Sequence, residues 1–259
     1  MVSDDARTVK RRGARRPADV PPEVLAALEA GEPSANHMEQ MAIDMTRLAA
    51  NVLPVADRSH PGLTSPRFLT RMRAGADIAH AALGSELFNA SLRWSSDTAR
   101  GWAAFAVTLE SDDLPEQLER ARRFAVDPHF AVREWAWLGV RPSIVERPLA
   151  ALGQLTPWAR DASPYVRRFA SEALRPRGVW SAHVIVFKES PETALPVLEP
   201  LVTDDVRYVR DSVANWLNDV SKTRPEWVLE QCHRWREEHG DRVAYVCRRA
   251  TRSIKGVRA

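Results

Sequence analysis

The chain has few cysteines, few lysines and no long apolar run. Its only two cysteines, Cys232 and Cys247, have no cysteine or histidine near them at zinc-ligand spacing, which indicates neither a disulfide framework nor a structural metal site. No stretch of about 18 apolar residues is present, and the first residues, MVSDDARTVKRRGARRP, lack the apolar core of a secretory signal. We therefore expect a cytoplasmic protein without metal or redox chemistry.

The basic side chains are nearly all arginines. Of the 37 Lys and Arg residues 33 are arginines, while the formal net charge is only +3. Guanidinium groups suit phosphate oxygens, because their fork of donors matches the geometry of the acceptors. A GC-rich genome also favours arginine codons whatever the protein does, so the arginine content alone does not decide the function.

The N-terminal end differs in composition from the rest. KRRGARR, residues 10–16, is strongly basic, so we expect residues 1–18 to be a disordered basic tail, either merely solvated or acting as a phosphate-binding arm. Residues 19–259 are expected to form a single domain. A short helix should begin at Pro22 and a longer one should carry the apolar stripe from Met38 to Val52, with a loop over residues 57–66 and a further helix over 67–83.

From residue 97 onward a sequence phrase recurs. DTARGWAAFAV, FAVREWAWLGV, PYVRRFASEAL, RYVRDSVANWL and AYVCRRATRSI superpose, each with a small apolar anchor near its start and, in most, an arginine directly after it. The anchors are Ala99, Val132, Val166, Val209 and Val246, so that successive anchors are 33, 34, 43 and 37 residues apart. Repeats of this length are typical of helical solenoids.

Other features of the repeats support an all-helical fold. An aspartate precedes three of the phrases (Asp127, Asp161 and Asp204), as expected for a turn or an N-cap before the second helix of each pair. The segments between the phrases supply the first helices, and almost none alternates with the two-residue period of a strand. The sequence therefore predicts an all-α, HEAT-like repeat α-solenoid, a right-handed superhelix of antiparallel helix pairs with a concave groove.

Polar side chains at three- and four-residue steps should share one face of each repeat helix. Three successive phrases each place a carboxylate there, in the sets Glu134, Trp137 and Arg141, then Arg168, Glu172 and Arg175, then Asp211, Asn215 and Asn218. A solvated HEAT-repeat face would also be charged. The pattern therefore leaves two interpretations open, a solvated surface or a site on the groove.

Several of the nine tryptophans fall in or just after these helices. Trp102 and Trp135 occupy one repeat position, where the next phrase has Phe169, which indicates a packing position in the core. Trp137 lies one turn after Glu134, and Trp180 follows Glu172 across the break RPRG; an indole beside a carboxylate can bind a cationic group. For Trp216, packing and function stay equally open.

The arginines divide in the same way. Those directly after an anchor (Arg100, Arg133, Arg167 and Arg210) are expected to pair with the preceding aspartate, although Arg210 is also a candidate for DNA contact. The arginines and the lysine outside that register are the better candidates for contact with phosphates. They are Arg168, Arg175, Arg177 and Lys222.

Taken together, the phrases resemble those of a known family. PPEVLAALEAGE, FAVREWAWLGVRP, SEALRPRGVW, VRDSVANWLNDVSKTRPEWV and VAYVCRRATRSI are similar to segments of the AlkC/AlkD superfamily of HEAT-repeat DNA alkylation-repair glycosylases, nearest the AlkC branch. The resemblance covers nearly the whole chain. It implies a DNA glycosylase that binds double-stranded DNA along the groove, as a cytoplasmic, nucleoid-associated monomer, and hydrolyses the N-glycosidic bond of purines alkylated at N3 or N7.

The resemblance also implies roles for particular residues. Glu172, with Trp180 eight residues later, matches the family's pairing of a pocket glutamate with an aromatic, and Asp211 or Asp219 falls where the family has a further carboxylate. The family's pattern sets a pocket glutamate opposite Trp137, which leaves Glu134, one turn away, as the candidate to replace it. The expected catalytic residues are thus Glu134, Glu172 and Asp211, with Trp137, Trp180, Trp216 and Asn215 at the lesion.

This chemistry needs no cofactor. A cationic purine leaves without protonation, so the enzyme has to stabilise an oxocarbenium-like sugar and position a water molecule, which carboxylates and indole faces can do. A strand-nicking lyase would need a nucleophilic amine, and the repeats contain only Lys188 and Lys222, so we expect a monofunctional enzyme. The alternative is a non-catalytic HEAT-repeat protein that binds DNA or acts as a scaffold, in which groove carboxylates would be dispensable or matched to basic partners.

Overall fold

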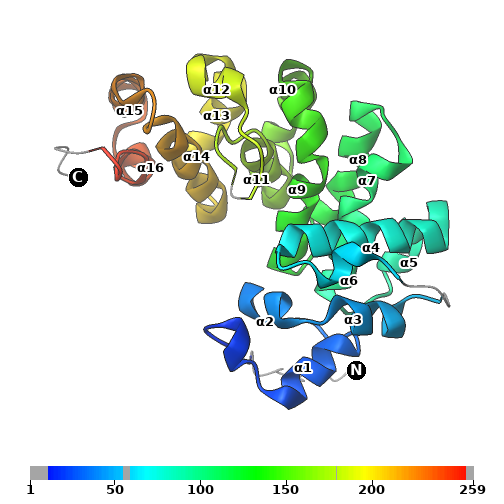
Figure 1. The fold of residues 1–259 in the computed structure, drawn as a ribbon. Coiled ribbons are helices and arrows are strands. Elements are labelled where there is room, and N and C mark those ends of the chain that lie inside the picture. The colour runs from blue at the N-terminus through cyan, green and yellow to red at the C-terminus, as the bar shows by residue number, and fades with distance from the viewer. Residues whose placement is uncertain (1–10, 55–58, 179, 255–259) are drawn as a thin grey trace, which may run out of the picture. The chain divides into compact units, whose positions relative to one another are not determined.

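The computed structural model of the chain describes residues 11–54, 59–178 and 180–254, and all regular structure within these ranges is helical (Figure 1). The expected all-α class is confirmed. Contacts divide the chain into two compact units, Met1–Ala106 and Val107–Ala259. The expectation of a single domain over residues 19–259 stays a prediction. In the described part of the chain, no helix combines the length and the apolar character that crossing a bilayer would need.

The first unit is built around the start of its last helix. Asp97 is buried there and accepts hydrogen bonds from the Ser34 backbone N–H (2.7 Å), from the Ser34 hydroxyl (2.9 Å) and from the Gln40 side chain. These contacts join segments that are about 60 residues apart in sequence. The elements are η1 (Pro17–Asp19), α1 (Pro22–Glu29), α2 (His37–Ala42), α3 (Met45–Val52), η2 (Pro61–Thr64), α4 (Phe68–Leu83), η3 (Gly84–Glu86), α5 (Leu87–Ser91) and α6 (Asp97–Phe105).

The expected helix over the apolar stripe from Met38 to Val52 is two helices in the structure. The chain breaks between α2 and α3 because Asp44 caps α3, accepting from the backbone N–H groups of Thr46 (2.9 Å) and Arg47 (3.3 Å). The short helix from Pro22 and the helix over residues 67–83 are confirmed as α1 and α4. In the loop expected over residues 57–66, Pro61–Thr64 forms η2.

The basic tail is only partly within the described ranges. Residues 1–10 lie outside them, but residues 11–18 have defined positions in contact with the fold. Arg11 forms an ion pair with the buried carboxylate of Glu39, and the side chain of Asn36 donates to the carbonyl of Ala14 (2.8 Å). Residues 11–18 are thus placed against the fold by side-chain contacts, and the expected disorder of residues 1–18 stays a prediction.

The second unit is a row of helix pairs. Its elements are α7 (Val107–Glu110), α8 (Leu114–Ala125), α9 (Phe130–Glu146), α10 (Pro148–Leu155), η4 (Pro157–Arg160), α11 (Pro164–Ala173), α12 (Ile185–Glu189), η5 (Pro191–Ala194), α13 (Leu195–Val202), α14 (Arg207–Val220), α15 (Pro225–His239), η6 (Gly240–Val243) and α16 (Ala244–Ala250). Helices α9, α11, α14 and α16 pack side by side in this order, while α8, α10, α13 and α15 are the other members of the pairs (Figure 1).

This arrangement confirms the repeat prediction. Each of the five phrases begins a helix, namely α6, α9, α11, α14 and α16, and all five anchor residues are buried. Trp102, Trp135 and Phe169 are likewise buried, as expected for one packing position. Because the apolar positions recur at helical spacing, each helix buries one stripe against its neighbours.

The aspartates before the phrases form turns rather than N-caps. The carboxylates of Asp127, Asp161 and Asp204 each accept the backbone N–H two residues further on, at 2.7 to 2.8 Å. In three repeats the arginine after the anchor donates to the backbone carbonyl of the preceding aspartate, for example Arg167 to Asp161 at 2.9 Å, whereas Arg100 donates to the carbonyls of Trp94 and Ser95. The carboxylate instead binds an arginine of the preceding repeat, as Asp204 does with Arg167 at 2.6 Å. The expected pairing is therefore corrected: these arginines bind the turn backbone and connect adjacent repeats.

Candidate active site

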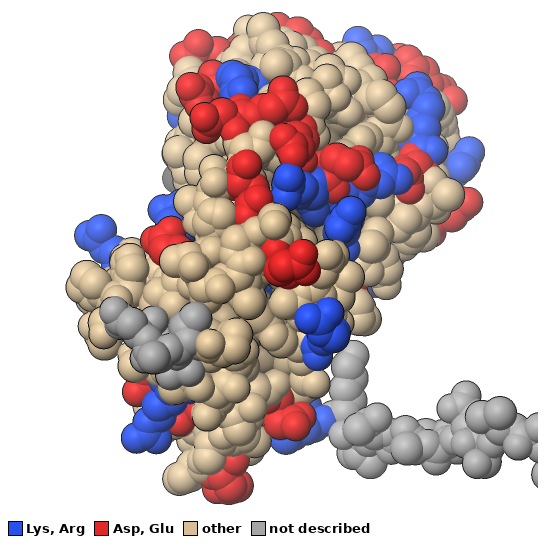
Figure 2. Space-filling view, turned by 90° about the vertical axis from the view of Figure 1, so that its right-hand side faces the viewer, with Lys and Arg blue, Asp and Glu red and all other residues tan. Residues whose placement is uncertain are grey.

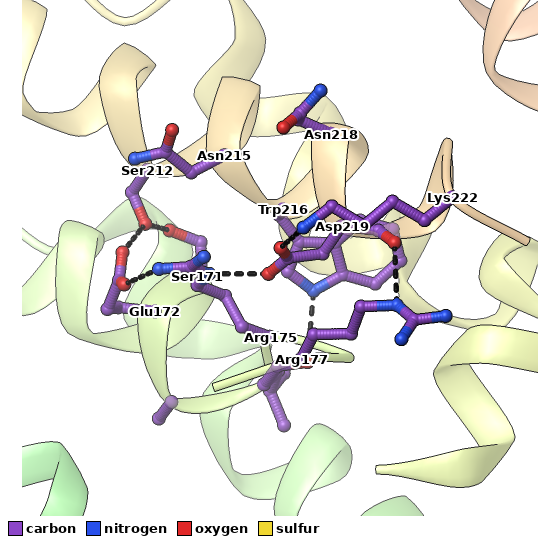
Figure 3. Close-up of polar contacts among 12 residues, drawn as sticks. Ser171, Glu172, Arg175, Arg177, Ser212, Asn215, Trp216, Asn218, Asp219 and Lys222 are labelled. Atoms are coloured by element: carbon purple, nitrogen blue, oxygen red, sulfur yellow. Dashed lines mark hydrogen bonds and ion pairs between the residues drawn. The ribbon is translucent and has the colours of Figure 1, made fainter. Parts of the chain in front are cut away.

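Three carboxylates and two guanidinium groups form a continuous network across α9, α11 and α14. Arg168 lies between Glu134 (2.7 Å) and Glu172 (3.6 Å), and Arg175 lies between Glu172 (2.7 Å) and Asp219 (2.8 Å). We call Glu134, Glu172 and Asp219 the carboxylate line. Figure 3 shows its α11 and α14 part, where Arg175 points between the two carboxylates.

Glu172 is the most buried member of the line, with 3% of its side chain exposed. The hydroxyl of Ser212 on α14 donates to it (2.7 Å), and Ser171 in turn donates to Ser212 (2.7 Å). Burial by itself would raise the pKa of Glu172, but the charges of Arg168 and Arg175 and the bond from Ser212 outweigh burial and hold this pKa below its ordinary value. Glu172 is therefore an ionised carboxylate at neutral pH.

Glu134 occupies the α9 end of the line. The indole N–H of Trp137, one turn further along α9, donates to its carboxylate (2.8 Å). Trp137 itself is 3% exposed, so its ring packs in the interior and does not present a face to a ligand. The expected contact of the Trp137 ring with the lesion is therefore corrected. Trp137 orients Glu134, and the Glu134 carboxylate is the group that reaches the surface.

Asp219 occupies the α14 end, close to two further cations. Lys222 lies 3.5 Å from its carboxylate, and the Nε of Arg177 donates to its backbone carbonyl (3.2 Å) (Figure 3). The Asp219 side chain is 5% exposed, whereas that of Lys222 is 47% exposed. Of the two carboxylates that the resemblance left open on α14, Asp219 is the one connected to Glu172.

Asp211, the expected third catalytic residue, contacts a different helix. It accepts a hydrogen bond from the Tyr245 hydroxyl on α16 and lies 3.4 Å from Arg249 and 3.8 Å from Arg207. Asn215, one turn further along α14, accepts from Arg252 (3.0 Å). The structure therefore brings Glu134 and Glu172 together, but places Asp211 and Asn215 among the arginines of the α14 and α16 pair.

Two residues expected on the polar face are buried, and so is Trp216, the tryptophan whose role the sequence left open. Trp216 is 0% exposed and donates its indole N–H to the carbonyl of Leu174 (3.0 Å), so it is a core residue and not a lesion contact. Asn218 is buried and donates to the carbonyl of Ala250 (3.1 Å). Arg141 is also buried, with its guanidinium against backbone carbonyls at the end of α11.

Arg141 holds the segment that carries Trp180. Its guanidinium donates to the carbonyls of Ala173 and Arg175 (both 2.5 Å) at the end of α11, and to that of Ala182 (3.1 Å). Burial lowers the pKa of Arg141 to about 10, so the group stays charged and complements the carbonyl end of the helix. Trp180 lies between these anchor points with φ of +61° and 51% exposure. Such a backbone conformation costs energy for a residue with a bulky side chain, and it holds an indole at the surface.

The side chains expected to bind DNA differ in whether they already bind other groups of the protein. Arg168 and Arg175 are 11% and 13% exposed and bind the carboxylate line, and Arg210 donates to the backbone carbonyl of Asp204. These three arginines are internal to the site or to the turn. Arg177 and the exposed Lys222 remain at its edge next to Asp219.

The sequence analysis missed the connecting groups. Neither Ser212 nor Arg141 was an expected site residue. Arg168 was expected to contact DNA and not to bind Glu134 and Glu172. Asp219 was named only as an alternative to Asp211. A signal for Asp219 was present, because Tyr208, Ser212, Asn215 and Asp219 follow one another at three- and four-residue steps along α14. In the described ranges of the chain, no three His, Cys, Asp or Glu side chains are grouped in a way that could hold a metal ion.

Comparison with known proteins agrees with this geometry. Residues 131–251, which contain the whole carboxylate line, match the model of the family described as DNA alkylation repair enzyme. The match covers a little under half of the chain and shows that this part is similar to that family. The resemblance stated above is thereby confirmed.

Individual relatives extend the comparison over more of the chain. The Pseudomonas fluorescens alkylpurine DNA glycosylase AlkC, solved bound to DNA containing an abasic site analog, is similar with a TM-score of 0.68 and 26% identity, over 90% of this chain and 62% of that one. AlkD2 from Streptococcus mutans shares the fold, with a TM-score of 0.53 and 24% identity over 70% of this chain and 82% of that one. The uncharacterized protein YhaZ of Bacillus subtilis (strain 168) is 40% identical over 100 residues, which are 39% of this chain and 28% of YhaZ. The chain thus covers less than two thirds of the length of AlkC and of YhaZ.

Proposed function

We propose that this protein is a monofunctional DNA glycosylase that hydrolyses the N-glycosidic bond of cationic N3- or N7-alkylated purines in double-stranded DNA. The observation that carries the proposal is the carboxylate line, and above all Glu172, a buried carboxylate kept ionised by two arginines and a serine. An ionised carboxylate can stabilise positive charge at the sugar and accept a proton from water, but it cannot protonate a leaving group.

The protonation state of Glu172 favours cationic substrates in particular. A neutral purine needs an acid to protonate it as it leaves, whereas a purine alkylated at N3 or N7 already carries the positive charge. Glu172 has a pKa below its ordinary value, so it offers no proton at neutral pH. Trp180, exposed beside the end of α11, supplies an indole face that can attract the cationic base.

The environment of the lysines supports a hydrolase without lyase activity. A lyase step begins with attack of an unprotonated amine on the sugar. The ammonium group of Lys222 is engaged by the Asp219 carboxylate at 3.5 Å, and Lys188 is on α12, outside the carboxylate line. The expected product is therefore an abasic site in an intact strand.

One observation favours the non-catalytic alternative, a HEAT-repeat protein that only binds DNA or acts as a scaffold. Each member of the carboxylate line has a basic partner, as expected if the carboxylates serve only to stabilise the fold. The two functions differ in a measurable way. A scaffold binds DNA and releases no base, whereas a glycosylase depends on particular carboxylates for base release.

The test is release of free base from duplexes that carry N7-methylguanine, N3-methyladenine or a bulky N7-guanine adduct. We expect release by the wild-type protein, and a loss on the order of 100-fold in Glu172→Gln, in the range found when a preorganised charge is removed. Glu134→Gln and Asp219→Asn test the other members of the line, and Asp211→Asn tests the position expected from the sequence. Glu199→Gln on α13 is the matched control, because Glu199 is exposed and pairs with Arg234 of α15 and not with an arginine of the line. DNA binding without release from any substrate would establish the alternative.

A further inference from the structure

Four arginines gather around Tyr245 where α14 meets α16. Arg207 of α14 lies over the Tyr245 ring at 5.0 Å, and Arg248 and Arg249 of α16 lie over it at 5.7 Å each. Arg252, directly after α16, reaches across to Asn215 of α14. We call Arg207, Arg248, Arg249 and Arg252 the arginine patch.

The equivalent position of the preceding repeat is charge-compensated, in contrast to the patch. All three tyrosines of the chain, Tyr165, Tyr208 and Tyr245, directly precede an anchor valine, and each lies under an arginine. The arginine over Tyr208 is Arg168, which also binds Glu134 and Glu172. Around Tyr245, in contrast, the ion pairs seen in the described part of the chain involve a single carboxylate, Asp211, for four arginines.

This arrangement is unfavourable for the fold alone. Four guanidinium groups and one carboxylate leave an excess of three positive charges at one helix contact, and like charges at short range repel. Burial and the charge of the nearby Arg249 lower the pKa of Arg252, which reflects the same crowding. The Nε of Arg249 is buried with no hydrogen-bond acceptor, although Asp211 lies 3.4 Å away. An anionic ligand at the exposed guanidinium groups would relieve the repulsion.

The patch is accessible and its side chains are oriented. Arg248 and Arg252 are exposed, and the Arg207 side chain is 70% exposed. Stacking on the tyrosine ring restrains the guanidinium plane, which leaves its outward N–H groups available for bidentate contacts with phosphate. By comparison, the face shown in Figure 2 has acidic and basic side chains interspersed.

We propose that the arginine patch binds the phosphate backbone of double-stranded DNA beside the carboxylate line. The identity of the ligand rests on the proposed function; the presence of an anion site does not. Asp211 and Asn215 belong to this surface, where they orient Tyr245, Arg249 and Arg252. Helix α14 connects the carboxylate line with the arginine patch. Ser212 and Asp219 of α14 contact the line, and Arg207 and Asp211 of α14 belong to the patch side. A duplex at the carboxylate line therefore continues onto the patch.

The salt dependence of DNA binding tests this surface. We would measure the affinity for an undamaged duplex by fluorescence anisotropy over a range of salt concentrations, for the wild type and for the triple variant Arg207→Gln, Arg248→Gln and Arg252→Gln. Each arginine that contacts a phosphate contributes about 0.9 to the slope of log affinity against log salt. We expect the slope to decrease by roughly 2 to 3 in the triple variant, and to be restored when the same three positions are lysine.

A matched variant separates local contact from total charge. Arg123→Gln, Arg160→Gln and Arg234→Gln together remove the same charge from exposed positions on α8, η4 and α15. Their slope should stay close to that of the wild type. Equal slopes in the two triple variants would overturn the proposal. So would equal affinity for duplex RNA with an equal loss in the patch variant, because that result would contradict the assignment to DNA.

The outcome for the patch is distinguishable from the outcome for the proposed function. If no alkylated duplex releases a base but the patch variant loses salt-dependent binding, the glycosylase fails and the DNA surface stands. If the wild type releases a base and the patch variant binds with the wild-type slope, the glycosylase stands and the patch fails. The single variant Arg248→Gln, at an exposed position without a side-chain hydrogen bond in the structure, repeats the test should the triple variant not fold.

Discussion

Replacing Glu172 by glutamine should destabilise the protein as well as reduce base release, on the order of 100-fold. Removing one partner of a buried ion pair typically costs about 3–5 kcal/mol, because the remaining charge is left uncompensated. In the variant, Arg168 retains its ion pair with Glu134, and Arg175 retains its ion pair with Asp219. The glutamine side chain can still accept the hydrogen bond from Ser212. We therefore expect a loss below that range, about 2–3 kcal/mol at pH 7.

The pH dependence of this loss gives a more specific test. The folded-state pKa of Glu172 lies below its unfolded value, so ionised Glu172 adds stability that is fully present above the unfolded pKa of about 4.3. That contribution disappears as the pH falls from there through the folded pKa. Glutamine cannot titrate. The difference in free energy of unfolding between wild type and Glu172→Gln should therefore be constant near neutrality and shrink steadily below about pH 4.5.

The measurement is urea unfolding followed by circular dichroism at a series of pH values. Glu199→Gln serves as the control, since an exposed carboxylate of α13 should contribute less than about 1 kcal/mol at any pH. Two results would refute the reasoning. One is a Glu172→Gln protein as stable as the wild type at pH 7, and the other is a stability difference that persists unchanged in acid, which would point to packing instead of charge.

Three further substitutions probe the residues around the line. Ser212→Ala removes the bond to the Glu172 carboxylate and should cost about 1.5–3 kcal/mol in urea unfolding, with partial loss of base release. Trp216→Ala empties a fully buried position and should cost about 3–5 kcal/mol, with soluble aggregates or a lowered Tm as the readout. Trp180→Gly removes an exposed indole and relieves the strain of a positive φ. Thermal unfolding should therefore show unchanged or slightly higher stability, while release of cationic bases falls. Reduced stability would contradict the structure.

The repeat architecture was predictable because its signal is repeated. Five phrases with buried anchors at comparable spacing reinforce one another, and each begins a helix in the structure. Where a sequence pattern occurs only once, a single side-chain contact can change the structure that forms. The stripe from Met38 to Val52 has the period of one helix, but a single Asp44 that can cap a new helix divides it. Residues 11–18 have the composition of a tail, yet the ion pair of Arg11 with Glu39 gives them defined positions.

The site was predictable in part, for a geometric reason. Sequence spacing indicates which residues share a helix face, and it correctly placed Glu134 and Glu172 on facing parts of neighbouring helices. It does not indicate which side of a broad polar face turns toward the preceding helix and which toward the next. Asp211 and Asp219 are two turns apart on α14, and only the packing shows that Asp219 meets Arg175 of α11 whereas Asp211 meets Tyr245 of α16. Burial, which decides the roles of Trp137 and Trp216, likewise depends on the neighbouring repeats.

The charge balance of the two regions explains how carboxylates can lie next to a DNA strand. The carboxylate line carries three negative charges, and its contacting cations Arg168, Arg175 and Lys222 carry three positive ones, so the network is neutral at neutral pH. A neutral network does not repel phosphates, whereas three unpaired carboxylates would. The excess positive charge lies instead on the arginine patch, one helix further along. Under the proposed function, binding energy from the phosphates would hold the duplex near Glu172, the carboxylate proposed to stabilise the positive charge that develops on the sugar.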